Sequence, residues 1–267
     1  MNQLPTYFLS HGGGPWPYLD GEMRQAHAVL EASLADIPRQ LGVTPKAVVM
    51  VSGHWDEEIF TVMANPHPPM IYDYGGFPEH TYRISYPAPG SPELATRIQD
   101  LLKAEGFSAG QDVARGFDHG AFVPLTVMYP NANVPVVQLS LRSDFDPEAH
   151  IRLGRAIASL RSEGILILGS GLSYHNLRRF NDSGASASRE FDQWLNETLR
   201  ESDLQKRAER LIRWTEAPSA RLAHPTADHF VPLMVAFGAA ERESARTIYH
   251  EDRFFGGLTV SSFRFGD

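Results

Sequence analysis

The sequence contains no cysteine. This absence excludes disulfide bonds, thiolate metal sites and a cysteine nucleophile together, and it is compatible with a reducing compartment. Any metal site in this chain must therefore be built from histidine and carboxylate side chains.

Long apolar runs and clusters of basic residues are lacking as well. No apolar run approaches the ~20 residues that cross a membrane, and the first residues have neither the basic nor the apolar segment of a secretory signal. The formal net charge is -8, and no Lys/Arg cluster resembles a stripe that follows a phosphate backbone. We therefore expect a cytoplasmic protein that binds neither membranes nor nucleic acid.

Strand-like and helix-like segments alternate along the chain. Its 267 residues and 42% apolar content are ordinary for one large globular domain. Apolar runs predict strands at 7–9, 48–51, 134–141, 165–168 and 258–263. Helical spacing predicts helices at 21–37, where Pro38 is expected to end the helix, and at 91–105, 147–163, 188–200 and 204–214. We predict one α/β domain over residues 1–267, with a central mixed sheet flanked by helices.

A long segment between residues 65 and 90 does not follow either pattern. It is rich in proline, glycine and aromatic residues, which predicts a loop with little regular structure. Loops of this length in a globular domain are usually functional, so we expect it to cover or line a site.

Histidines stand just past the ends of three predicted strands. His11 follows residues 7–9, His54 follows 48–51 and His175 follows 165–168, while His229 opens the apolar segment 230–237. In open α/β sheets, ligands bind at the edge where the strands end. Neutral imidazoles gathered there suit a divalent transition metal. The sequence therefore predicts a metal enzyme with these four histidines at its centre.

Each of these histidines also has a structural interpretation. His11 could sit in a simple turn, although the three glycines after it let a ligand approach the backbone. His175 could serve only its own turn. His119 and His229 stand in similar phrases, each of which predicts a helix that starts with histidine and has proline in its first turn. His119 could therefore be a capping residue or could face a substrate.

The remaining histidines divide into two groups. Helical or terminal contexts place three of them on the surface, namely His27, His150 and His250. The context leaves the others open, namely His67, His80 and His224.

Two other common sites are missing their defining residues. The glycines at 12–14 are not followed by the Lys-Ser/Thr pair that completes a phosphate-binding P-loop. The chain also lacks the His-Glu-x-x-His stretch of the helix-borne zinc proteases. The remaining possibility is a site whose residues come from turns that are far apart in the sequence.

Several motifs in a fixed order resemble a known family. These motifs are Phe8-Leu9-Ser10-His11-Gly12, Val51-Ser52-Gly53-His54-Trp55, Tyr74-Gly75-Gly76-Phe77-Pro78, Tyr86-Pro87-Ala88-Pro89-Gly90, Gly116-Phe117-Asp118-His119-Gly120, His175-Asn176-Leu177 and His224-Pro225-Thr226-Ala227-Asp228-His229. Together they are similar to class III extradiol ring-cleaving dioxygenases of the DOPA 4,5-dioxygenase type. The resemblance runs from about residue 7 to the C-terminus.

This resemblance implies a cofactor, a substrate class and roles for the histidines. It implies non-haem Fe(II), with Zn(II) possible at the same position, and a catechol-type substrate that reacts with O₂. His11, His54 and His229 match metal ligands, and His175 matches either a fourth ligand or the acid/base group beside the metal. His119 matches a histidine that contacts substrate. A histidine thus takes the place of the carboxylate in the usual facial triad, and we expect Asp228, on a helix, to point elsewhere.

The predicted reaction is extradiol ring opening to a semialdehyde. His175, or His119 if His175 binds the metal, would take a proton from the catechol and later return one. Two alternatives use the same histidines: a zinc-dependent hydrolase, which would work without O₂, and a non-catalytic metal-binding protein. The ring substituent, the native metal and the oligomeric state do not follow from spacing.

Overall fold

A six-stranded sheet forms the centre of the molecule, in the strand order β6-β2-β8-β1-β10-β9. The computed structural model describes residues 3–267. Strands β6, β2, β8 and β1 pair in parallel, whereas β10 runs antiparallel to both β1 and β9. The strands are β1 (Thr6–Ser10), β2 (Ala47–Ser52), β6 (Val136–Gln138), β8 (Ile165–Gly171), β9 (Ala245–Phe254) and β10 (Leu258–Phe265). The predicted central mixed sheet is confirmed.

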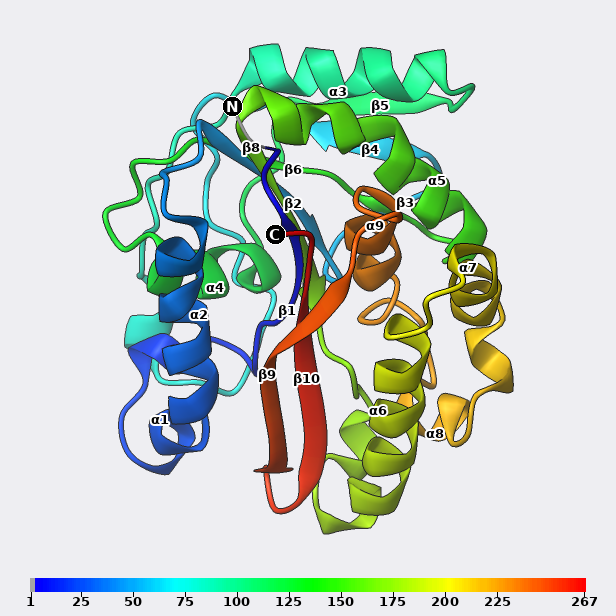
Figure 1. Cartoon of the computed structure of the whole chain (residues 1–267). Helices are drawn as coiled ribbons and strands as arrows, with labels where there is room; N and C mark the ends of the chain where they lie inside the picture. The colour runs from blue at the N-terminus through cyan, green and yellow to red at the C-terminus, as the bar shows by residue number, and fades with distance from the viewer. Residues whose placement is uncertain (1–2) are drawn as a thin grey trace.

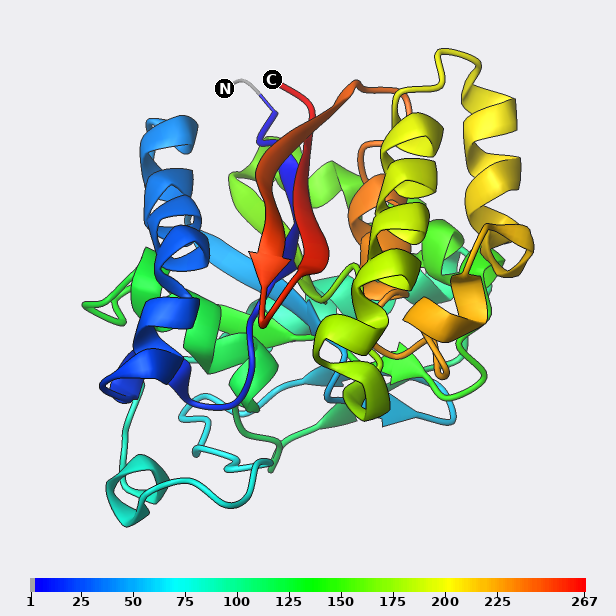
Figure 2. The same cartoon turned by 90° about the horizontal axis from the view of Figure 1, so that it is seen from below.

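Helices cover both faces of this sheet. In Figure 1, α2 and α4 lie on one side of the sheet, and α5, α6 and α9 lie on the other. Figure 2 shows the same layers from below. The helices are α1 (Glu22–Ala26), α2 (Ala28–Leu41), α3 (Pro92–Ala104), α4 (His119–Met128), α5 (Pro147–Ile157), α6 (Ala185–Leu199), α7 (Leu204–Ile212), α8 (Ala220–Ala223) and α9 (Pro232–Gly238). Within residues 3–267, no helix has the length and apolar character that crossing a membrane requires.

The central strands are continuous apolar runs because helices cover them on both sides. Every residue of β1, β2 and β8 is buried. A parallel strand in this position needs apolar side chains at successive rather than alternate positions. This is why short apolar runs are enough to predict these strands from the sequence.

Two small parallel sheets lie beside the main one. The first pairs β3 (Asp56–Glu57) with β7 (Leu141–Arg142), and the second pairs β4 (Phe60–Met63) with β5 (Ala109–Asp112). The single strand predicted at 134–141 is therefore wrong: the chain leaves the main sheet after β6 and enters the first small sheet at β7.

The predicted helices are correct in place but not always in their ends. The helix at 91–105 is confirmed as α3, capped by Ser91, whose side chain accepts the N–H of Leu94. The helix at 21–37 is wrong in two respects, because it breaks at His27 and then runs through Pro38 to Leu41. The buried residues of α2 all precede the proline, and Gly42, with φ of 65°, ends the helix.

Two more segments differ from the structure that the sequence patterns predict. The helix predicted at 147–163 is α-helical only to Ile157 and tightens into a 3-10 helix up to Glu163. Strand β9 is absent from the predictions because it is a half-exposed edge strand with a largely polar sequence. The 3-10 helices are η1 (Trp16–Tyr18), η2 (Glu79–Tyr82), η3 (Ala158–Glu163), η4 (Leu177–Arg179), η5 (Asp182–Gly184) and η6 (Trp214–Glu216).

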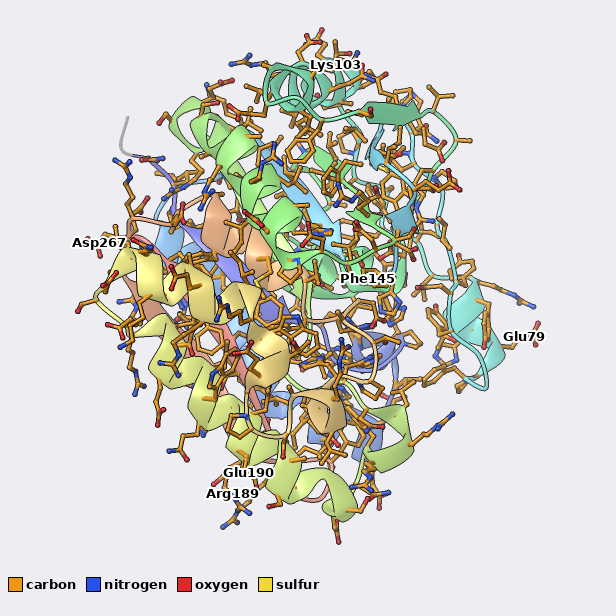
Figure 3. The ribbon with its side chains drawn as sticks, turned by 90° about the vertical axis from the view of Figure 1, so that its right-hand side faces the viewer. Glu79, Lys103, Phe145, Arg189, Glu190 and Asp267 are labelled. Carbon is orange, nitrogen blue, oxygen red and sulfur yellow. The ribbon has the colours of Figure 1, made fainter. Side chains whose placement is uncertain are left out.

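The long loop is confirmed as irregular, with η2 as its one helical turn between residues 65 and 90. Figure 3 shows Glu79, on this turn, at the edge of the molecule opposite the C-terminal Asp267. The same loop reaches inward at Asp73, where it joins the histidines described next.

Candidate active site

Three strand ends carry histidines to one edge of the sheet. The parallel register sets Ser10 beside Gly171 and Ser52 beside Ser170, so β1, β2 and β8 end at the same level. His11 follows β1 directly, His54 follows β2 after one residue, and His175 stands shortly after β8. The predicted convergence of these side chains follows from this register.

His229 reaches the same edge from the turn before α9. The main chain of this turn crosses the end of β8, where Leu172 donates its N–H to the carbonyl of His229 at 3.0 Å. A side chain at Gly171 would collide with that carbonyl. The expectation that His229 starts a helix is wrong, because α9 begins three residues later at Pro232; His119, by contrast, does start α4, although its proline, Pro124, lies beyond the first turn.

His11, His54 and His229 form a compact cluster. One ring nitrogen from each lies within 4.8 Å of the other two. The Nε2 atoms of His54 and His229 are 3.0 Å apart. Burial and the neighbouring imidazoles hold the pKa values of His11 and His229 well below the usual range. Both rings are therefore neutral and available as ligands.

Carboxylates fix the proton positions on two of these rings. Nδ1 of His229 is 2.7 Å from Asp228 Oδ2, and Nδ1 of His54 is 3.1 Å from Asp73 Oδ2. Each carboxylate accepts from an Nδ1–H, which leaves a lone pair on each Nε2. The two Nε2 atoms face each other at 3.0 Å, an arrangement that a proton on His54 or a metal ion bound between the nitrogens would satisfy. Asp228 thus lies in a turn and orients His229, so the expectation that it points away on a helix is wrong.

The donor set fits a divalent transition metal. Two imidazole nitrogens bound ~2.1 Å from one ion at roughly right angles would stand about 3.0 Å apart, which is the separation seen for His54 and His229. Both nitrogens of His11 are buried without a hydrogen-bond partner in the part of the chain that the structure describes. A metal ion would satisfy this otherwise costly imidazole.

His119 and Asp73 extend the cluster on one side. His119 Nδ1 donates to Asp73 Oδ1 at 2.8 Å, and its backbone N–H donates to the same oxygen at 3.0 Å. Burial works against the charge of Asp73, but hydrogen bonds from His119 and His54 prevail and hold its pKa well below the usual range. Burial likewise opposes a charge on His54, but Asp73 and the nearby carboxylates outweigh it and raise the pKa of His54. Burial lowers the pKa of His119.

Asp73 is the residue of this site that the sequence patterns miss. It comes directly before the Tyr74–Pro78 motif, in a loop where aromatic and proline residues dominate. Its position next to that motif is the only sequence signal, and nothing in the spacing indicates that it contacts both His54 and His119.

His175 lies beside the cluster, stacked on the ring of His229. The two ring centroids are 3.4 Å apart and the planes differ by 12°. Lone pairs in the planes of two nearly parallel rings do not converge on one point, so this stack disfavours a metal shared by His175 and His229. Burial lowers the pKa of His175 to about 4, so the ring is neutral and able to accept a proton.

A buried carboxylate ties β2 to α4 beneath the site. Asp118 is completely buried and accepts from Ser52 Oγ at 2.8 Å, Arg115 Nη2 at 2.8 Å and Gln138 Nε2 at 2.7 Å. Ser52 Oγ in turn accepts the N–H of His54 at 3.1 Å. This network fixes the main chain of His54 relative to the helix that begins at His119.

The remaining histidines lie outside the cluster. His250 is exposed as expected, and the two histidines left open at 67 and 80 are exposed as well. The surface placement of His27 and His150 is wrong, since both rings are fully buried. Each donates from Nδ1 to the carbonyl four residues earlier and accepts a backbone N–H at Nε2, which makes burial tolerable. His224 is also buried and bonds the carbonyl of Ser173.

Comparisons with known proteins identify the family of this chain. The family model described as the catalytic LigB subunit of aromatic ring-opening dioxygenase matches residues 5–266. A 4,5-DOPA dioxygenase extradiol of Beta vulgaris is 40% identical, covering 99% of this chain and 97% of that protein. A protein of the same name from Escherichia coli K12 is 36% identical over 99% of this chain and 95% of its own length.

A solved structure has the same architecture. The crystal structure of an uncharacterized protein, JW3007, of Escherichia coli K12 superposes with a TM-score of 0.81 at 30% identity, covering 99% of this chain and all of that one (100%). The fold and the sequence together define an extradiol ring-opening dioxygenase, an oxidoreductase that acts on catechol-type substrates. The chain belongs to the LigB family of aromatic ring-opening dioxygenases. The dioxygenase prediction is thus confirmed over the hydrolase and the non-catalytic protein.

Proposed function

We propose that residues 1–267 form one catalytic domain that holds Fe(II) between His11, His54 and His229 and opens a catechol ring with O₂ beside the diol, giving a semialdehyde. The observation that carries this proposal is the pair of facing Nε2 atoms of His54 and His229, 3.0 Å apart, with each Nδ1 next to a carboxylate. A metal ion would satisfy this pair, and His11 adds a third nitrogen without a competing partner among residues 3–267.

Iron is the metal that suits the reaction of this family. Fe(II) held by the three imidazoles would supply both the redox partner for O₂ and a Lewis acid for the two catechol oxygens. Zn(II) fits the same nitrogens but has no redox chemistry. We therefore propose Fe(II) as the active form and Zn(II) as a bound but inactive form.

We propose different roles for two histidines outside the ligand set. Asp73 keeps the proton of His119 on Nδ1, so Nε2 is the basic atom of that ring. His175 is neutral and stacks on His229. We assign proton transfer from and to the substrate to His175, and contact with the substrate to His119.

Aromatic side chains of the long loop pack beside His119. Tyr74 meets the ring of His119 edge to face, with centroids 5.8 Å apart, and also contacts Tyr82 and Phe77. A catechol ring would pack well against such a wall. Because relatives at 34–40% identity are named 4,5-DOPA dioxygenase extradiol, we propose a catechol that carries a side chain, with DOPA as the first compound to test.

Oxygen uptake tests the proposal. The apoprotein is loaded anaerobically with Fe(II) or with Zn(II) and mixed with DOPA and other substituted catechols in air-saturated buffer. We expect stoichiometric O₂ uptake and a yellow semialdehyde with Fe(II) alone. Bound Fe(II) without uptake on any catechol would reject the substrate class, and equal turnover with Zn(II) would reject the role of iron.

A further inference from the structure

His27 is a buried histidine that the proposed chemistry does not use. It stands at the break between α1 and α2 and is fully buried. Its ring lies flat on the indole of Trp16, with centroids 4.8 Å apart and planes within 2°. Phe254 and Phe255 close the other sides at 5.4 and 5.3 Å. The imidazole is therefore held firmly in one orientation.

The stacked rings of Trp16 and His27 hold the turn that follows His11 by hydrogen bonds. Trp16 Nε1 donates to the carbonyl of His11 at 2.8 Å, and the N–H of Gly13 donates to His27 Nε2 at 3.2 Å. His27 Nδ1 donates to the carbonyl of Met23 at 2.8 Å, which leaves the Nε2 lone pair for Gly13. The main chain is thus bonded on both sides of Gly12.

Gly12 shows how closely the turn fits the pair. It has a φ of +79°, in the left-handed region where glycine is favoured. A Cβ built on it would lie 2.7 Å from Cδ2 of His27. The rings therefore pack directly against the backbone of the turn, and the turn has little room to move.

His11 differs from the other two proposed ligands in how its ring is oriented. Asp73 and Asp228 lie at the Nδ1 atoms of His54 and His229. Both nitrogens of His11 lack any such partner within residues 3–267. Its backbone is the part that is fixed: its N–H donates to the carbonyl of Gly171 at 3.1 Å, and the turn after it is held through the carbonyl of His11 and the N–H of Gly13.

We propose that Trp16 and His27 are positioning residues for the metal site, and that their hold on the turn at 11–13 does for His11 what a carboxylate does for His54 and His229. The inference rests on the proposed function, because it takes His11 as a ligand. It predicts that loosening the turn weakens metal binding even though neither side chain touches the metal.

The test is the dissociation constant of Zn(II), measured by competition with a chromophoric chelator. Partners that orient a ligand typically contribute 10–100-fold to metal affinity, so we expect about a tenfold weaker Kd or more for His27→Phe, which keeps a ring but loses both hydrogen bonds. His27→Gln, whose amide oxygen reaches about as far as Nε2, should recover most of the affinity. Trp16→Phe, which removes only the indole N–H donor, should weaken binding in the same direction.

His150 offers a matched control. It is equally buried and also donates to the carbonyl four residues earlier, that of Asp146, and accepts a backbone N–H, that of Arg142. His150→Phe should therefore lose stability in the same way as His27→Phe, measured by urea unfolding of the apoproteins, but keep the wild-type Kd.

Each possible result of these Kd measurements has its own interpretation. A wild-type Kd in both His27→Phe and Trp16→Phe would overturn the positioning role, because their effects would then be structural alone. If His27→Phe does not fold, Trp16→Phe and His27→Gln decide the question. A wild-type protein that fails to bind Zn(II) would instead reject the proposed metal site, and the positioning role with it.

Discussion

Single hydrogen bonds decide what each histidine of the site can do. A neutral imidazole has one N–H and one lone pair, and the partner of one nitrogen sets the role of the other. Asp73 and Asp228 take the N–H of three rings, those of His54, His119 and His229. The lone pairs that remain are the chemically useful atoms. The predictions for single residues therefore concern the removal of one side chain or of its hydrogen-bond partner.

Removing the charge of Asp73 should weaken the metal site. In Asp73→Asn the amide offers one oxygen where two ring N–H groups need an acceptor, so His54 and His119 compete for it. We expect a loss of 10–100-fold in metal affinity, measured as the Zn(II) Kd. The control is Asp144→Asn, an exposed carboxylate paired with Arg142 at 2.7 Å. Equal affinities in the two variants would show that Asp73 does not support the site.

Replacing His229 and His175 should separate binding from proton transfer. For the proposed iron site, we expect His229→Gln to lose the metal, because one of the three clustered ring nitrogens is gone. His175→Gln should keep its iron but lose turnover by about 10²–10⁴-fold, the usual contribution of an acid/base group. Metal content by elemental analysis and kcat on the best catechol measure the two effects. Loss of iron in His175→Gln would make His175 a ligand instead.

At the scale of elements, the end of β8 decides where His229 lies. Gly169 and Gly171 leave space for the main chain of residues 229–232 to cross the strand, and a Cβ at either position would collide with a carbonyl of that segment. The close approach brings the turn before α9 to the strand ends that carry His11 and His54. The position of His229 therefore depends on the small residues at the end of β8.

The variant Gly171→Ala tests this dependence. The new methyl group would overlap the carbonyl of His229, so we expect destabilisation of about 1–3 kcal/mol from overpacking, together with weaker metal binding. Urea unfolding and the Zn(II) Kd measure the two effects. Gly75→Ala is the control, because its Cβ would meet nothing within 4 Å in the described structure and its φ is not positive. A Gly171→Ala protein with wild-type stability and affinity would contradict the role given to this crossing.

For the whole molecule, buried neutral histidines link folding to pH. Burial lowers the pKa values of His27 and His150 to about 4 and that of His224 to about 3. In the unfolded chain these rings titrate near pH 6.5, so below that pH the unfolded state binds protons that the folded state does not bind. The stability these groups contribute is complete above pH ~6.5 and declines as the pH falls toward ~4.

The pH dependence of unfolding in His150→Phe tests this linkage. Between pH ~6 and ~4.5, each such histidine adds up to about 1.4 kcal/mol per pH unit to the slope of the unfolding free energy. We expect the variant to be less stable than the wild type at pH 7 but to lose stability less steeply as the pH falls. Urea unfolding of the apoproteins at several pH values measures this. Parallel curves would mean that His150 does not remain neutral in the folded protein.

The sequence by itself determined the class of fold and most of the histidines that meet in the candidate site. Helix-covered parallel strands must be apolar at every position, so β1, β2 and β8 stand out in the sequence, and parallel strands end at one edge, so His11, His54 and His175 were expected there. Ordered motifs around these residues indicated the family, because the residues of a functional site keep local sequence signatures.

Tertiary structure alone decided the contacts between segments far apart in the chain. Asp73, 46 residues before His119, joins the site because a loop without periodic pattern folds inward. The burial of His27 depends on Trp16 and the β9–β10 turn, and the stack of His175 on His229 depends on the crossing at Gly171. Spacing along a chain reports neighbours within one element; which loops meet, and which ring nitrogen keeps its lone pair, is set only when the elements pack.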